Sequence, residues 1–558
     1  MKRTLFLFPL FLLTASVCFS GDFYWAEPID GEMGQPDNWN PPAVPGADDS
    51  VYFTLPSAYT VWFESDYIHD RMTVDGSDLT LQLNGHTYLL DGTADYNRTV
   101  LLADTQSSAL RIGGGGVFSG DLLIGDNDPQ TVGALHLSGP DTFWSGYRTD
   151  GWHGFFYGVL GSAQVSVTEG AVLEHGHGQS GIDGKADFLI DGQDTEWYVD
   201  GYFGMSIYGD TLVTLSNGAR MDFGYLEMAR HARSSAVIDI VGTAHQTELI
   251  IENYWWDPIS LNLGMGGSAQ INLTGSKLLH LGHTAIALFP GSCGELNITD
   301  GSWADLQGSV AVGGTLDKPG GRGLISLSAD PDKGLYAELS AANHQAGEQI
   351  TVWPEGVIRM EEGQISAEYS PGQANPIVLK GGTLEGWGWI RADVVNESGI
   401  VMPGVSGMWK FLDIIYNYYQ GSNGTLKIGI GGLHSAWGHS ILTAQAQEGG
   451  QVVLDGYLDV DLLDGYVPNY EDSFAIIEAR HINGRFLNAV SEVIFEEGTF
   501  DILYQTDRVV LTHFRSDPRC PSYPNADFNR DCRVDMNDLA VLAGQWLECR
   551  YEPGDFCP

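Results

Sequence analysis

A short segment that recurs along the middle of the chain constrains the fold more than any other feature. Each copy reads as a short strand, a turn that contains glycine and a second short strand. In the copy that begins at Gly161, Val165 and Val167 alternate with polar residues before Gly170. This is the period-2 pattern of a strand with one buried face. The other copies begin at Gly133, Lys185, Asp210, Ser235, Gly267 and Gly294.

The spacing of the copies selects among repeat folds. We aligned the copies on the alanine near the start of each, or on the residue that takes its place. This residue falls at positions 134, 163, 186, 212, 236, 269 and 295, at intervals of 29, 23, 26, 24, 33 and 26 residues. A propeller blade needs about 40 residues in four strands, whereas one coil of a β-helix is shorter. The 72 glycines are spread along the chain, as frequent turns require. We therefore predict a mainly β protein built on a right-handed parallel β-helix, a solenoid.

The rest of the chain divides around these β-helix repeats, which we place at 111–400. Residues 21–110 are predicted as an N-terminal cap and the first β coils, because an uncapped solenoid exposes an edge strand. From Tyr418 the pattern loosens into what reads as antiparallel strands, so 401–515 is predicted as a small terminal antiparallel β-domain. The segment from Ser516 resembles a linker, and 516–558 is a separate module.

The first twenty residues predict export. Lys2 and Arg3 precede an apolar run from Leu5 to Leu13, the pattern of a signal peptide over 1–20. Cys18 follows Val17, where a lipoprotein signal prefers a small residue. No later stretch reaches the roughly 18–20 apolar residues that cross a bilayer. We expect a secreted, extracellular or cell-surface protein without a transmembrane segment.

The charge of the chain excludes one class of partner. Acidic residues number 72 and basic residues 27, for a net charge of −45. A field of that sign repels nucleic acid and anionic lipid, so neither is expected to bind. It is compatible with calcium binding, and acidity also simply keeps an extracellular protein in solution.

A twelve-residue loop near the C-terminus has an oxygen donor at every calcium-ligand position. EF-hand loops supply six to eight oxygens from positions 1, 3, 5, 7, 9 and 12, position 7 through its backbone carbonyl. The predicted metal ligands are Asp527, Asn529, Asp531, Arg533, Asp535 and Asp538. We therefore predict bound calcium, with a chance acidic turn as the alternative.

The loop resembles a dockerin type I repeat more than a calmodulin-type EF-hand. Val534 occupies the apolar anchor position, and Pro521 and Pro524 stand where an entering helix would lie. The apolar face predicted for a following helix consists of Leu539, Leu542, Ala543, Trp546 and Leu547. The resemblance implies a cohesin-like or cell-envelope partner. The chain departs from it in having Cys532 at position 6, where glycine is usual, and only one repeat.

Four cysteines crowd into the last 39 residues, at Cys520, Cys532, Cys549 and Cys557. In an oxidising compartment they predict two disulfides, and three connectivities remain open. A zinc site is disfavoured because the chain lacks CxxC spacing here. Two disulfides would stabilise a module too small to stabilise itself. Cys293 stands alone.

The chain as a whole resembles secreted bacterial β-helix proteins related to autotransporter passengers and PEP-CTERM-type exported proteins. The resemblance rests on the opening NW…VPG, the repeated glycine turns, and GGTLEGWG from Gly381 followed by MPG. It extends to a tail in which Tyr-Gln, Gly-Thr-Leu and Gly-Tyr follow one another in that order before Pro and Phe. It implies a surface-exposed β-helix and no particular active site.

Two clusters of polar residues are candidates for catalysis. Asp191, Asp194 and Glu196 lie close enough in sequence for the carboxylate pair of a glycosidase, although turns favour the same residues. Glu174, His175 and His177 could provide a general base or metal ligands, or simply an exposed turn.

Aromatic residues are candidates for stacking on sugar rings, with ordinary packing as the alternative. They are Tyr254, Trp255, Trp256, Trp387 and Trp389. The run from Gly113 to Gly116 lacks a following Lys-Ser/Thr, so no phosphate loop is predicted.

We therefore predict a non-catalytic extracellular scaffold or adhesion protein with a calcium-binding terminal module. The alternative is a carbohydrate-active enzyme, a polysaccharide lyase or glycoside hydrolase, or a glycan-binding protein. That alternative would make an extracellular polysaccharide the partner. Fold analogy is its only warrant at the level of sequence.

Overall fold

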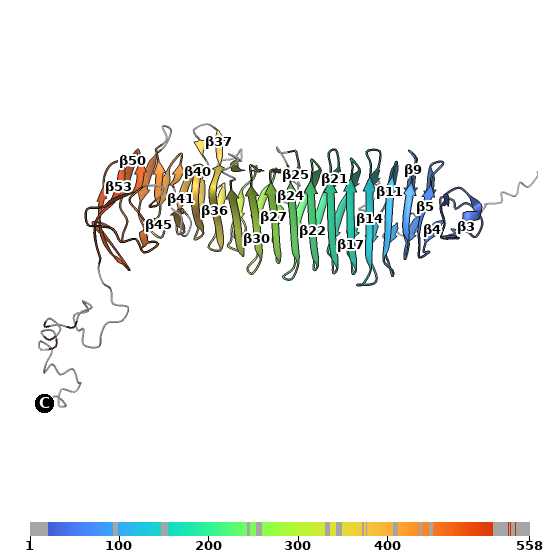
Figure 1. Cartoon of the computed structure of the whole chain (residues 1–558), viewed down its shortest axis with the longest axis horizontal. Coiled ribbons are helices and arrows are strands. Elements are labelled where there is room, and N and C mark those ends of the chain that lie inside the picture. The colour runs from blue at the N-terminus through green and yellow to red at the C-terminus, as the bar shows by residue number, and fades with distance from the viewer. Residues whose placement is uncertain are drawn as a thin grey trace, which may run out of the picture. The chain divides into compact units, whose positions relative to one another are not determined.

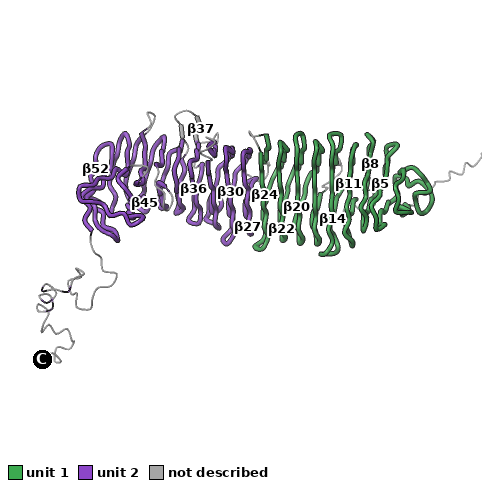
Figure 2. Tube along the Cα trace, viewed as in Figure 1, with its two compact units in different colours: residues 1–254 green, residues 255–558 purple. Residues whose placement is uncertain are grey.

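The chain divides into two compact units, Met1–Tyr254 and Trp255–Pro558 (Figure 2). The computed structural model describes residues 20–516 and also residues 534, 536, 539 and 542. The gaps within the first range are 93–98, 147–153, 243–245, 253–258, 330–334, 342–348, 371–372, 375, 405–410, 435–437 and 446–449. We call the two parts unit 1 and unit 2.

Three short strands make one coil, and each strand pairs in parallel with its counterpart one coil away (Figure 1). In unit 1, β17 (Ser162–Thr168), β18 (Val172–His175) and β19 (His177–Ser180) form such a coil. They pair with β20 (Lys185–Asp191) and with the two halves of β21 (Glu196–Met205). The predicted parallel β-helix is thus confirmed as the architecture of the repeats.

Unit 1 contains three columns of parallel strands. The first column consists of β5 (Ala58–Trp62), β8 (Asp78–Gln82), β11 (Ser108–Gly113), β14 (Val132–Ser138), β17, β20, β22 (Asp210–Ser216) and β24 (Ser235–Val241). The second consists of β6 (Tyr67–His69), β9 (Thr87–Leu90), β12 (Gly116–Ser119), β15 (Phe143–Ser145), β18, the first halves of β21 and β23 (Arg220–Met228), and β25 (Glu248–Ile251). The third consists of β1 (Asp22–Trp25), β4 (Ser50–Phe53), β7 (Arg71–Val74), β10 (Val100–Leu102), β13 (Leu122–Ile124), β16 (Gly154–Tyr157), β19 and the second halves of β21 and β23.

Unit 2 repeats this arrangement. Its first column consists of β27 (Ser268–Thr274), β30 (Cys293–Thr299), β33 (Arg322–Ser328), β36 (Gly356–Ser366), β40 (Thr383–Arg391), β42 (Ile400–Pro403), β45 (Thr425–Ile430) and β48 (Tyr457–Leu462). The second consists of β28 (Lys277–His280), β31 (Trp303–Leu306), β34 (Ala337–Ser340), β36, β40, β43 (Phe411–Ile414), β46 (Ile441–Ala444) and β49 (Ser473–Ala479). The third consists of β26 (Ile259–Leu263), β29 (His283–Ile286), β32 (Val310–Val312), β35 (Ile350–Val352), β39 (Pro376–Leu379), β41 (Asp393–Asn396), β44 (Tyr418–Gln420), β47 (Gln451–Leu454) and β50 (His481–Gly484).

Inward-facing side chains of successive coils stack in register. Val165, Phe188, Val213 and Ile238 follow one another up the first column of unit 1, and each is buried. Burial of such a side chain contributes roughly 1.5–3 kcal/mol. Because a single coil cannot cover its own apolar face, the coils are stable only when stacked.

From β13 onward, each third-column strand of unit 1 is followed directly by a left-handed residue. The chain takes a positive φ at Gly125, Gly158, Gly181, Ser206 and Ala229, each directly after a strand of this column. Glycine adopts this conformation without strain, whereas alanine and serine do not. The high glycine content therefore reflects a requirement of the turns.

The N-terminal end of unit 1 is closed by tryptophans. Following the short helix η1 (Pro36–Asn38), β3 (Trp39–Asn40) pairs antiparallel with β1, while β2 (Gly31–Glu32) pairs in parallel with β5. The rings of Trp25 and Trp39 meet edge to face with centroids 5.2 Å apart. The indole N–H of Trp39 donates to the carbonyl of Met33 at 2.9 Å. These rings cover the first inward-facing side chains.

The sequence alignment of the copies is wrong by one residue at three positions. Ala134, Leu212 and Glu295 pair with Gln164, Asp187 and Gln270, all on the outward face. The inward partners of Ala163, Ala186 and Ala269 are instead Gly133, Thr211 and Gly294. A slip of one residue moves a side chain to the other face of the strand.

The predicted antiparallel domain begins much later than Tyr418. The strands from β44 to β48 still pair in parallel with strands of the preceding coils. In the same way, β49 pairs in parallel with β46, and β50 with β47. Antiparallel pairing joins β49 to β53 (Arg508–Arg515), β53 to β52 (Gly498–Tyr504) and β52 to β51 (Glu492–Phe495). A further short antiparallel pair is β37 (Glu368–Ser370) with β38 (Gln373–Ala374). Coils that lose the sequence pattern keep their pairing because the backbone ladder is independent of side-chain identity.

Candidate functional site

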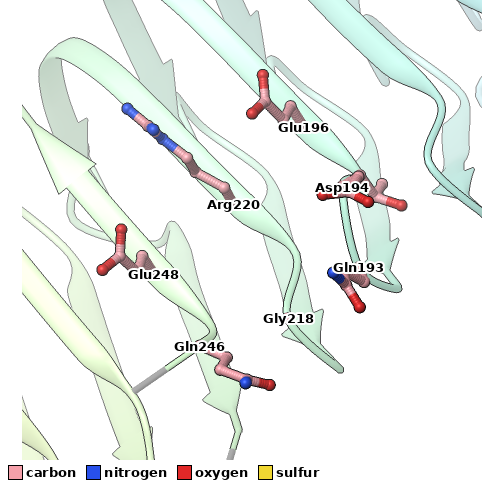
Figure 3. A pocket seen from close by; sticks show the side chains of 8 residues that line it. Gln193, Asp194, Glu196, Gly218, Arg220, Gln246 and Glu248 are labelled. Carbon is pink, nitrogen blue, oxygen red and sulfur yellow. The ribbon is translucent and has the colours of Figure 1, made fainter. Parts of the chain in front are cut away.

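A surface pocket of 330 Å³ lies on unit 1 beside the start of three neighbouring second-column strands (Figure 3). The pocket combines turn residues with charged side chains from β21, β23 and β25. Its lining residues are Gln193, Asp194, Thr195, Glu196, Gly218, Arg220, Gln246 and Glu248.

Opposite charges alternate from coil to coil across this pocket. Glu196 pairs in register with Arg220, and Arg220 with Glu248. Neighbouring strands lie about 4.8 Å apart, so the guanidinium has a carboxylate-bearing strand on each side. A hydrogen bond from Arg220 to Asp222, and then the charges of Asp222, Glu196 and Glu248, raise the pKa of Arg220. The pocket therefore offers charged donors and acceptors side by side.

Asp222 accepts a hydrogen bond from Arg220 within the same strand. The two side chains are two residues apart on the outward face of β23, and Nη2 of Arg220 donates to Oδ2 of Asp222 at 2.8 Å. The side chain of Asp222 is only 9% exposed, against 46% for Arg220. The second oxygen of Asp222, Oδ1, is buried and has no hydrogen-bond partner among the described residues. A buried acceptor left in this state costs about 1–3 kcal/mol.

Another carboxylate, Asp200, lies on this face beside a bulge in β21. After Val199, β21 carries one residue more than β23, so that Asp200 and Gly201 stand opposite Gly224 alone. A Cβ on Gly224 would lie 2.4 Å from the carbonyl oxygen of Asp200, so glycine permits the close approach. The hydroxyl of Tyr198 donates to Oδ1 of Asp200 at 3.1 Å.

The carboxylates on this face influence one another. Burial, followed by the charges of Asp222 and Asp200, raises the pKa of Glu252. Burial and then Asp200 raise the pKa of Tyr198 to about 12, with smaller effects of Glu252 and Asp222. We call the outward residues Glu196, Tyr198, Asp200, Arg220, Asp222, Glu248 and Glu252 the acidic face.

The structure separates the three carboxylates predicted as a glycosidase-type group. Asp194 and Glu196 line the pocket, whereas Asp191 does not. Asp191 accepts hydrogen bonds at 2.6 Å from Ser216 and Asn217 one coil away, which is a structural role in the turn. Arg220, Asp222, Glu248 and Glu252 were not among the predicted residues. The signal that could have found them is the alignment of the segments RMDFG and ELIIE with EWYVD. That alignment depends on the lengths of the loops between the segments.

The predicted group of Glu174, His175 and His177 is likewise divided. His175 points into the core and is fully buried, where burial lowers its pKa to about 3. Glu174 lies on the outward face of the same strand. Nδ1 of His177 accepts the backbone N–H of Tyr202 at 3.0 Å, and burial lowers the pKa of His177. The exposed turn proposed for His175 is therefore wrong, and its role is in packing.

The predicted sugar-stacking aromatic residues are also placed differently. Tyr254, Trp255 and Trp256 lie outside the described residues. Trp387 is buried, and Trp389 packs edge-on against Tyr336 and Phe411 at 5.5 and 6.2 Å between centroids. These contacts favour packing. Within the run from Gly113 to Gly116, a Cβ on Gly115 would lie 2.4 Å from the carbonyl oxygen of His86, which accounts for that glycine by packing.

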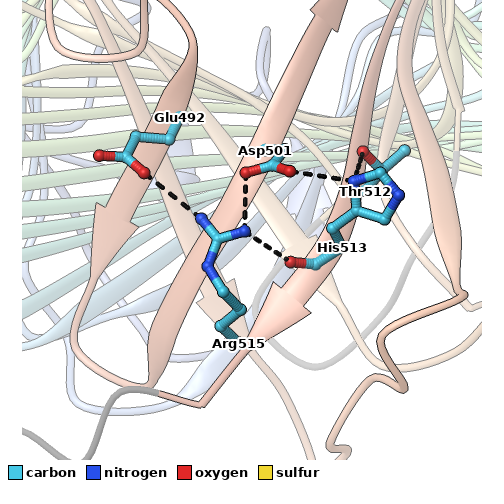
Figure 4. Close-up of polar contacts among 5 residues, drawn as sticks. All are labelled: Glu492, Asp501, Thr512, His513 and Arg515. Carbon is cyan, nitrogen blue, oxygen red and sulfur yellow. Dashed lines mark hydrogen bonds and ion pairs between the residues drawn. The ribbon is translucent and has the colours of Figure 1, made fainter.

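A second polar cluster joins the antiparallel strands of unit 2 (Figure 4). Arg515 donates to Asp501 at 2.8 Å and to Glu492 at 3.3 Å, and Nδ1 of His513 lies 2.9 Å from Asp501. Arg515 and then His513 lower the pKa of Asp501. The same Nδ1 lies 3.4 Å from the hydroxyl of Thr512. Since these contacts tie β53 to β52 and β51, we assign the cluster a structural role.

All six predicted calcium ligands, from Asp527 to Asp538, lie outside the described residues, as do the signal peptide before residue 20 and Cys520, Cys532, Cys549 and Cys557. Cys293 has no disulfide, and its sulfur lies 3.0 Å from Nη2 of Arg322. Within the described part of the chain, no group of three or more His, Cys, Asp or Glu side chains could hold a metal ion. Nor does any helix there have the length and apolarity needed to cross a membrane.

No protein-family model matches this chain, and no curated protein matches it at a significant level.

Proposed function

We propose that the protein is a secreted, cell-surface β-helix scaffold whose C-terminal module binds calcium and attaches the scaffold to a partner. The stacking of coils in register carries this proposal. Each unit presents long, regular columns of outward side chains on a backbone held by continuous ladders. Such a surface suits extended ligands, because the spacing between strands repeats at about 4.8 Å.

The attachment role rests on the loop from Asp527 to Asp538, with its dockerin-like ligand pattern. A cohesin-like or cell-envelope protein is the partner class that this resemblance implies. The resemblance to autotransporter passengers and PEP-CTERM-type proteins supports exposure outside the cell.

A second candidate function is action on an extracellular polysaccharide, as a binding protein, a lyase or a glycoside hydrolase. The pocket that contains Asp194, Glu196, Arg220 and Glu248 favours it. Carboxylates that flank a hollow are the groups on which glycosidases rely.

Calcium titration of the full-length protein by calorimetry tests the attachment module. We expect one site in the wild type, and its loss when Asp527 and Asp531 are both changed to alanine. The matched control changes the exposed residues Glu496 and Glu497 to alanine, which removes the same charge and should leave binding intact. Unchanged binding in the Asp527/Asp531 variant would refute the assigned ligands.

A polysaccharide panel assayed for reducing ends and unsaturated products separates the two candidate functions. A scaffold yields neither product. Turnover that is abolished by Glu196→Gln would establish the enzyme and overturn the non-catalytic role.

A further inference from the structure

We propose that residues 539–547 of the C-terminal segment dock on the outer face of the antiparallel sheet that ends unit 2. The docking surface is a row of apolar side chains across β49, β53, β52 and the segment before β51. We call it the terminal apolar row, and it consists of Ala475, Val510, Leu503 and Val490. This contact within the chain goes beyond the proposed function and requires neither calcium nor a polysaccharide.

Pairing in register brings the four side chains of the terminal apolar row next to one another. Ala475 pairs with Val510, and Val510 pairs with Leu503. The N–H of Ile502 donates at 3.0 Å to the carbonyl one residue after Val490. This bond continues the pairing of β51 with β52 and places Val490 opposite Leu503. Since neighbouring strands lie about 4.8 Å apart, the row is about 14 Å long.

The terminal apolar row lies on the solvent side of its sheet. Val490 is 54% exposed and Leu503 is 46% exposed, while Val510 and Ala475 are half-buried. Contiguous apolar side chains left in water are unfavourable, and on a folded protein they mark a surface that another element covers. The row is therefore a candidate docking surface.

Charged side chains border the terminal apolar row on both sides. On one side, Arg515 contacts Asp501 and Glu492 (Figure 4). On the other side, Glu478 pairs in register with Arg508. An apolar centre with a polar rim is the usual anatomy of a protein interface. The row therefore fits a narrow apolar stripe, such as one face of a helix.

The C-terminal segment carries such a stripe in its sequence. The apolar face predicted for its helix consists of Leu539, Leu542, Ala543, Trp546 and Leu547. Leu539 is 52% exposed in the structure. A helix of about nine residues is not stable alone and depends on the packing of its apolar face. The stripe thus needs a surface to cover it.

The connection to β53 selects this occupant over a second copy of the chain. β53 ends at Arg515, five residues after Val510, so the row lies about 15 Å from the end of the strand. Residues 516–538 can span up to about 75 Å, which exceeds that distance. Tethering also raises the local concentration of the segment to about the millimolar range. A second copy would instead bring its own net charge of −45 and lose translational freedom.

Photo-cross-linking in the full-length protein, with p-benzoylphenylalanine in place of Leu503, tests the docking. After reduction and trypsin digestion, we expect mass spectrometry to find the cross-link on the peptide 534–550. Leu542→Asp places a charge on the apolar stripe and should lower the yield of this cross-link by about tenfold or more. The control Val541→Asp makes the matched change on the opposite side of the predicted helix and should alter the yield by less than about twofold.

Isotope labelling separates docking within the chain from contact between copies. In an equal mixture of unlabelled and heavy-isotope-labelled protein, cross-links confined to each isotopic form support the proposal. Cross-links that join light and heavy peptides would assign the row to a second copy and overturn it. So would the absence of any cross-link to 534–550, or equal yields with and without Leu542→Asp.

Two further positions guard against misfolding and against unspecific contact. Should the substitution at Leu503 prevent folding, the same cross-linker at Val490 must give the same result. At Phe289, which is 47% exposed and lies several coils away in unit 2, the cross-linker should not reach the segment. An equal yield from Phe289 would show that the contact is unspecific and would refute the proposal.

Discussion

Acidification from pH 7 to pH 5 is expected to destabilise unit 1, because His175 is buried in its neutral form. The indole N–H of Trp197 can only donate, and it lies 3.0 Å from Nε2 of His175. Nε2 is therefore the acceptor, and Nδ1–H donates to the carbonyl of His177 at 2.9 Å. Protonation of Nε2 would break the bond to Trp197 and place a charge in the core.

The magnitude follows from the difference in pKa between the folded and unfolded states. Burial lowers the pKa of His175 to about 3 in the folded protein, against about 6.5 in an unfolded chain. The contribution of neutral His175 to the free energy of unfolding is fully present above pH 6.5. It is lost as the pH drops toward 3, since the unfolded chain takes up the proton first. At pH 5 this loss is about 2 kcal/mol, a large share of the 5–15 kcal/mol typical of a domain.

Urea unfolding followed by tryptophan fluorescence, at pH 7 and pH 5 and constant ionic strength, measures this loss. His175→Gln removes the titrating group but keeps an acceptor for Trp197. Its free energy of unfolding should fall by about 2 kcal/mol less between the two pH values than that of the wild type. His481→Gln, at an exposed histidine, is the control and should retain the wild-type dependence. Equal pH dependence of wild type and His175→Gln would refute the reasoning.

Two further predictions concern the turns of unit 1 and use the same unfolding assay. Ala229 has a φ of 54°, so Ala229→Gly should raise the free energy of unfolding by about 0.5–1 kcal/mol, whereas Ala186→Gly, in a buried strand, should lower it by about 1 kcal/mol. A loss of stability in Ala229→Gly would contradict the strain at that turn. A Cβ on Gly184 would lie 1.8 Å from the carbonyl oxygen of Gly161, so Gly184→Ala should cost about 3 kcal/mol. A change below about 0.5 kcal/mol would show that the coils can separate there at little cost.

Local patterns of the sequence were enough to predict the architecture. Alternation such as that of Val165 and Val167, with glycine turns at a regular interval, is a property of short segments. Each segment has one apolar face in its own sequence, so the parallel coil can be predicted from one copy and its repetition. The calcium loop is equally local, because its ligands lie within twelve residues, and it remains a prediction.

Which side chains meet across coils was decided by the tertiary structure alone. Glu196, Arg220 and Glu248 form a row because the turns between them have lengths that bring these positions into register. The bulge at Asp200 and the burial of Asp222 depend on the same register. A slip of one residue would reverse every face, and outward residues carry no apolar signal that could reveal the slip. The sequence by itself thus determined the repeating coil, and the stacking of the coils determined the acidic face.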